Sequence, residues 1–106
     1  MEQYLVPDFH QLREIVISKM RFFSDNSGNR IFSDVELSNL SRIEISYLSQ
    51  NSVSRHGLTT NLDKSKRISI NNCRVRLNRN LFQKKYLDYA EFVLFHEYIN
   101  CLGNFT

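Results

Sequence analysis

Cysteine is scarce in this chain of 106 residues, which contains only Cys73 and Cys101. Neither residue belongs to a C-x-x-C pair, and two isolated cysteines do not indicate a disulfide framework. Because thiols stay reduced in the cytoplasm, the sequence predicts two buried free thiols in a cytoplasmic protein.

Long apolar stretches are also missing. No run approaches the roughly 18 apolar residues that a membrane-spanning helix needs, and the start MEQYLVPDFHQLREIV lacks the apolar segment of a signal peptide. The only glycines, Gly28, Gly57 and Gly103, are too dispersed to form a phosphate-binding loop. The sequence therefore predicts a soluble protein with no membrane partner.

Charge is unevenly distributed along the chain. The formal net charge is +3, yet residues 64–85 contain no acidic side chain. The basic residues of this stretch are Lys64, Lys66, Arg67, Arg74, Arg76, Arg79, Lys84 and Lys85. Hydrophobic residues make up 42% of the chain, enough for one core, and we predict a single domain over residues 1–106.

The first half of the chain carries two helix signals. Apolar residues at helical spacing predict a helix that begins at Pro7 and Asp8 and ends before the turn-forming residues 24–29. Ser33 and Glu36 have the spacing of a capping box, which predicts a short second helix.

The last part of the chain predicts a largely buried helix. It should begin near Tyr86 or Asp88, and Asp88 with Glu91 has the spacing of a capping box. The run that follows is mostly apolar and contains no helix breaker until Gly103, which suits the position just after a helix.

Between these helices the hydrophobic period changes to two, which is typical of strands. We expect strands at residues 42–47, 54–61 and 74–78, with Gly57 as a weak point or a bulge. The order of helix, strands and helix indicates an α+β fold with a small antiparallel, mixed-edge sheet of three or four strands.

One motif in the last helix indicates a chemistry. The segment FVLFHEYINCLG contains His96 and Glu97 but has Asn100 where the zinc-protease pattern H-E-x-x-H needs its second histidine. Residues four apart share one helix face, so two imidazoles there could bind one zinc while the glutamate activates a water molecule. The longer pattern H-E-x-x-H-x-x-G-x-x-H places Gly103 on its glycine and Thr106 on its last histidine.

The stretch RVRLNRNLFQKKYLDYAEFVLFHEYINCLG resembles the SprT-like and related minimal gluzincin-type metallopeptidases. In that family an edge strand of the type I-x-L-N-x-x-L precedes the helix that carries H-E-x-x-H. The corresponding strand residues here are Val75, Leu77, Asn78 and Leu81. The resemblance is close over residues 74–103 and looser from residue 42 onward.

This resemblance implies a zincin-like fold with zinc as the cofactor. His96 would be the first zinc ligand, Glu97 the general base, and Asn100 a degenerate second ligand. The third ligand of the family normally lies beyond this helix, and the chain stops at Thr106. We therefore expect a metallopeptidase-like domain, truncated after its active-site helix, whose catalysis is impaired.

The resemblance also implies that a polypeptide lies in extended form along an edge strand at Arg74, Arg76 and Asn78. An unpaired edge strand would in addition permit self-association. His56, in the segment SRHGLTT, is either a loop histidine or a side chain that approaches the cleft beside His96.

Two other interpretations stay open. The chain could be a non-enzymatic module whose basic stretch binds nucleic acid or protein, because such cations contact phosphates. The residues for this contact are Lys64, Lys66, Arg67, Arg79, Lys84 and Lys85. The same stretch could equally be a solvated sheet face. In the third interpretation the chain is an unrelated α+β domain in which His96 is merely packed.

Overall fold

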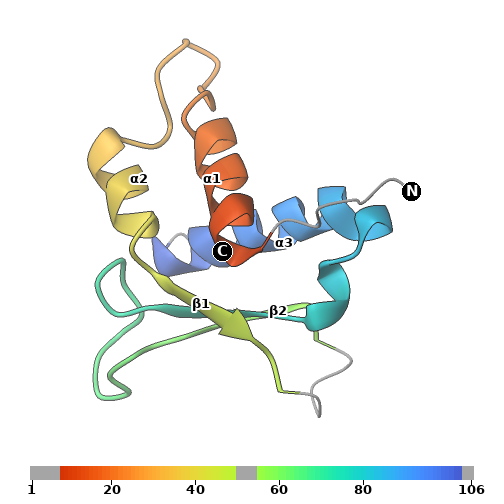
Figure 1. Cartoon of the computed structure of the whole chain (residues 1–106). Coiled ribbons are helices and arrows are strands. Elements are labelled where there is room, and N and C mark those ends of the chain that lie inside the picture. Colours follow the sequence, from red (N-terminus) through yellow and green to blue (C-terminus); the bar gives the residue numbers. More distant parts are fainter. Residues whose placement is uncertain (1–7, 50–54, 104–106) are drawn as a thin grey trace.

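A computed structural model describes residues 8–49 and 55–103 of the chain and has the predicted α+β class. Three α-helices and three strands follow one another in the order α1, α2, β1, β2, β3, α3 (Figure 1). Two short 3₁₀ helices, η1 and η2, lie between β3 and α3. The bounds are α1 Phe9–Met20, α2 Asp34–Leu40, β1 Glu44–Tyr47, β2 Gly57–Thr60, β3 Arg74–Leu77, η1 Arg79–Leu81, η2 Lys84–Tyr86 and α3 Leu87–Cys101.

Local signals place the first two helices correctly. Asp8 caps α1 and forms a capping box with Gln11, whereas Pro7 lies outside the described residues. Ser33 and Glu36 form the predicted capping box of α2. Each box satisfies backbone N–H groups that a helix leaves unpaired at its start.

The predicted capping box of the last helix is wrong. Helix α3 begins at Leu87 after the N-cap Tyr86, and no side chain caps this end. Glu91 instead forms an ion pair with Lys19 of α1. The short helix η2 runs directly into α3, so a cap at Asp88 would fall inside the helix. Gly103 follows the helix with φ +79°, as predicted for a residue that stops a helix.

The sheet has three strands in the order β1-β3-β2. Strand β1 runs parallel to β3, with Ile45 opposite Val75, and β2 runs antiparallel to β3, with Thr59 opposite the same valine. The expected antiparallel sheet is therefore corrected to a mixed one. The chain leaves β1, crosses to β2 on the far side, and returns into the middle, so only the β2–β3 pair is antiparallel.

All three α-helices lie on one face of the sheet (Figure 1). Val75 and Leu77 of β3 are completely buried under these helices, together with Leu94 and Tyr98 of α3. Alternation along β3 sends Arg74 and Arg76 to the other face, where both are half-buried. The site-bearing helix α3 is thereby held across the sheet by the core.

The two cysteines form a disulfide between Cys73 and Cys101, which corrects the prediction of two free thiols. Cys73 directly precedes β3 and Cys101 ends α3, so the crossing of helix and sheet brings their Cα atoms to 5.6 Å. That spacing is ordinary for a disulfide. Sequence spacing alone could not show this contact, because the two residues are 28 positions apart.

Candidate functional site

Helix α3 places the three motif residues in different environments. His96 is exposed to solvent, Asn100 is half-buried, and Glu97 is buried with only 6% of its surface exposed. The Thr59 hydroxyl of β2 donates a hydrogen bond to Glu97 Oε1, and the Asn100 amide lies 3.4 Å from the same oxygen. The carboxylate is thus directed into the contact between α3 and β2.

Gly57 makes this close contact possible. A Cβ atom at residue 57 would lie 2.9 Å from Glu97 Oε2 and 2.9 Å from Val93 Cγ1. Those distances are too short for a side chain, so α3 approaches β2 closely because residue 57 is a glycine. The sequence predicted a weak point or a bulge at Gly57, whereas β2 pairs with β3 in regular register from this residue onward and the glycine permits a close helix–strand approach.

These residues do not fit a catalytic zinc centre. Such a centre needs three protein ligands around an open position, and in the described residues no three His, Cys, Asp or Glu side chains are grouped to hold a metal ion. The Asn100 amide group is directed at Glu97, and Glu97 is already held by Thr59. Thr106, the position of a further histidine in the longer pattern, lies outside the described residues.

A groove of about 370 Å³ lies between the start of β2 and the outer side of α3. Its lining residues are Arg55, His56, Gly57, Tyr89, Phe92, Val93, His96 and Glu97. The structure thus brings His56 and His96 to one groove, which favours the cleft alternative for His56. The His56 ring stands edge-on to Tyr89 at 5.1 Å between centroids.

The outer edge of β2 borders this groove. Asn78 N donates to His56 O at 2.9 Å, and Leu48 N donates to Leu77 O at 2.9 Å. The backbone N–H and C=O groups of even-numbered residues in β3 are therefore directed toward β2, and those of odd-numbered residues toward β1. In an antiparallel pair the intervening residues direct their N–H and C=O groups away from the partner. Gly57 and Thr59 are those residues, and in the described ranges no other strand pairs with their outer side.

The prediction that a substrate pairs with the strand at Arg74, Arg76 and Asn78 is wrong. β3 is the central strand, and β1 and β2 occupy its two sides, so Arg74 and Arg76 cannot receive a peptide by strand pairing. Asn78 is buried, and its side chain donates to Arg55 O and accepts from Asn80 N. It does not extend a cationic surface. The edge strands of this sheet are β1 and β2.

The basic residues of the 64–85 stretch fall into separate groups. The loop between β2 and β3 carries Lys64, Lys66 and Arg67, all exposed. Arg74 forms an ion pair with Glu44 at 3.0 Å, which reduces the charge of the sheet face.

Three further basic residues, Arg79, Lys84 and Lys85, follow β3 at the opposite end of that strand from the loop. The Arg79 guanidinium lies 4.1 Å above the Tyr47 ring, and Lys85 Nζ lies 5.0 Å from the Tyr86 ring. Lys84 is exposed. The predicted strip is therefore interrupted by partnered side chains between its two ends.

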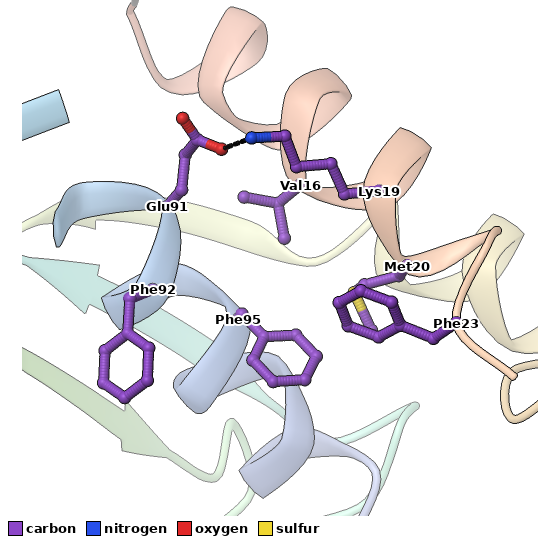
Figure 2. Close-up of a pocket in the computed structure, with 7 residues that line it drawn as sticks. All are labelled: Val16, Lys19, Met20, Phe23, Glu91, Phe92 and Phe95. Carbon is purple, nitrogen blue, oxygen red and sulfur yellow. Dashed lines mark hydrogen bonds and ion pairs between the residues drawn. The ribbon is translucent and has the colours of Figure 1, made fainter. Parts of the chain in front are cut away.

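A second hollow of about 280 Å³ lies between α1 and α3, on the other side of Phe92 (Figure 2). Its walls are apolar, formed by Val16, Met20, Phe23, Phe92 and Phe95. The ion pair between Lys19 and Glu91 closes one rim of this hollow, as Figure 2 shows. Apart from Lys19 and Glu91, its described lining residues are apolar, so its chemistry is that of an apolar contact.

Comparisons with protein-family models, with curated proteins and with solved structures find no match for this chain. Within the described ranges, none of the helices is long and apolar enough to cross a membrane.

Proposed function

We propose that this chain is a zincin-like domain that binds an extended polypeptide along the outer edge of β2 without hydrolysing it. The observation that carries the proposal is the position of Gly57 and Thr59. Their outward N–H and C=O groups lie along the edge of β2, and Gly57, the first residue of that strand, lines the groove that contains His96. An extended segment that adds to a sheet edge gains main-chain hydrogen bonds there and specificity from the adjacent pockets.

The same geometry argues against hydrolysis. A general base must reach the water that it activates, whereas Glu97 is buried and bonded to Thr59. Asn100 contributes an amide in place of an imidazole, which is a poor zinc ligand beside histidine. Binding of a polypeptide therefore fits these residues better than peptide hydrolysis.

Peptide binding at β2 predicts a specific pattern of amide protection. In the free protein the amides of Leu58 and Thr60 should exchange slowly, because they bond to β3, while those of Gly57 and Thr59 exchange faster. Saturation with a strand-forming peptide, selected from a random display library, should slow Gly57 and Thr59 by about tenfold or more. NMR-detected hydrogen exchange measures all four amides in one sample.

The bound peptide provides the matched control. N-methylation of alternate peptide amides should abolish binding at one set of positions and leave it nearly unchanged at the other, as strand pairing requires. Uniform tolerance of N-methylation, or no added protection at Gly57 and Thr59, would show that the peptide does not pair with β2.

Restoring the missing histidine tests the zincin-like part of the proposal. Asn100→His places two imidazoles four residues apart on α3, with His56 lining the same groove. We expect stoichiometric zinc by native mass spectrometry in this variant and none in the natural sequence. His96→Ala in the Asn100→His background should remove the metal again.

Each other outcome of the zinc measurement has a defined meaning. Stoichiometric zinc in the natural sequence would contradict the impaired centre. Absence of zinc from both proteins would remove the catalytic interpretation of this chain, and it would leave the peptide-binding test unaffected.

Nucleic acid is the second candidate ligand, favoured by the exposed cations of the β2–β3 loop at Lys64, Lys66 and Arg67. Phosphate contacts make affinity fall steeply with salt. Salt-dependent binding of a DNA duplex, lost on neutralising these three residues, would support this alternative over the peptide.

A further inference from the structure

We propose that the groove beside β2 selects a peptide with an acidic side chain, a specificity that rests on the proposed peptide binding. Arg55, His56 and His96 line the groove, and Glu97 is the only acidic residue among its described lining residues. The ligand that these side chains recognise is therefore a carboxylate presented by a segment paired with β2.

The charge of the groove follows from where Glu97 is directed. Its Oε1 accepts hydrogen bonds from Thr59 and Asn100, and its Oε2 lies over Gly57. With only 6% of its surface exposed and one oxygen held by two hydrogen bonds, this carboxylate is not presented to a ligand at the rim. Arg55 and His96 both line the groove and are exposed. A guanidinium binds a carboxylate with paired hydrogen bonds, stronger than those of neutral partners.

The aromatic residues define how the ligand fits. Phe92 is 61% exposed and Tyr89 is 41% exposed, which is unusual for side chains of this size. Their rings stack at 6.3 Å, and Tyr89 also holds His56 edge-on. The apolar stem of an acidic side chain would cover these rings while its carboxylate reaches Arg55 and His96. The groove volume of about 370 Å³ suits one such side chain with its neighbouring backbone.

An internal acidic residue fits this arrangement better than a chain terminus. The outward groups of Gly57 and Thr59 offer pairing along the strand, so a bound segment can continue past the groove in both directions. We therefore assign the carboxylate to a glutamate or aspartate side chain of an extended segment.

The test uses short blocked peptides of alternating threonine and valine, in which one glutamate occupies each position in turn. Affinities from fluorescence polarisation are compared with those of the same peptides carrying glutamine. We expect one register in which glutamate binds about tenfold tighter, as one charge-assisted hydrogen bond implies. The double variant Arg55→Gln, His96→Gln should reduce this preference to about twofold or less. Arg42→Gln, which removes an exposed arginine outside the groove, should retain it.

The outcomes separate the two proposals. Equal affinities for glutamate and glutamine peptides, with Gly57 and Thr59 still protected, would overturn acidic selection and leave β2 pairing intact. A glutamine peptide with a free terminal carboxylate that binds as tightly as the blocked glutamate peptide would overturn the side-chain assignment. Failure of every peptide to bind, with no amide protection, would overturn both proposals.

Discussion

Reduction of the Cys73–Cys101 disulfide should lower the free energy of unfolding by about 3–4 kcal/mol. The bond closes a loop of 28 residues and joins the start of β3 to the end of α3. Closing such a loop removes conformations from the unfolded chain, which is the main source of the stabilisation. Urea unfolding of the same protein with and without reductant measures the difference while keeping every atom of both buried side chains.

The double variant Cys73→Ala, Cys101→Ala is the control, because reductant should have no effect on its unfolding midpoint. The bond itself is checked by alkylation, which should label the unfolded natural protein only after reduction. Identical midpoints with and without reductant, together with thiols that react unreduced, would contradict the disulfide. In a reducing cytoplasm the domain would lose this stabilisation, so the cytoplasmic location stays a prediction.

Substitution of Gly57 by valine should cost about 2–3 kcal/mol of stability. A Cβ atom at this position would lie 2.9 Å from Glu97 Oε2 and from Val93 Cγ1, so α3 has to move away from β2. The displacement also disturbs the hydrogen bond between Thr59 and Glu97. Urea denaturation measures the loss, and the same variant should bind the β2-pairing peptide more weakly because the groove changes shape.

Thr60→Val is the matched control, since Thr60 is on the same strand but directed to the face opposite α3. Its effect should stay within about 0.5 kcal/mol. The double variant Gly57→Val, Glu97→Ala should be less destabilised than the sum of its single variants, because the shortened residue 97 makes room. Strict additivity would show that the contact with Glu97 does not limit residue 57.

Local patterns predicted much of the fold. The capping box at Ser33 positioned the second helix because a cap depends only on residues three apart, and the predicted start of the first helix at Asp8 agrees with its observed N-cap. Strict alternation gave β1 and β3 close to their observed bounds. The capping box at Asp88 failed because η2 continues into the helix, so the same local pattern fell inside an element.

The candidate site was only partly predictable. His96, Glu97 and Asn100 were identified from their spacing, and a helix does place them on neighbouring faces. Their roles were not predictable, because these depend on which side of α3 meets β2. That contact buries Glu97 and leaves His96 exposed. Arg55, Tyr89 and Phe92 were missed, since no local pattern connects a strand flank to a distant helix.

The sequence by itself determined the helices, the strands and the residues of the His96 motif, because these depend on short-range spacing and periodicity. Only the tertiary structure decided that β3 is central with β1 and β2 at the edges, and that Cys73 and Cys101 form a disulfide. It also decided that His56 shares a groove with His96. These features depend on contacts between residues far apart in the chain. They arise from the packing of α3 against the sheet, which the spacing of residues along the sequence does not indicate.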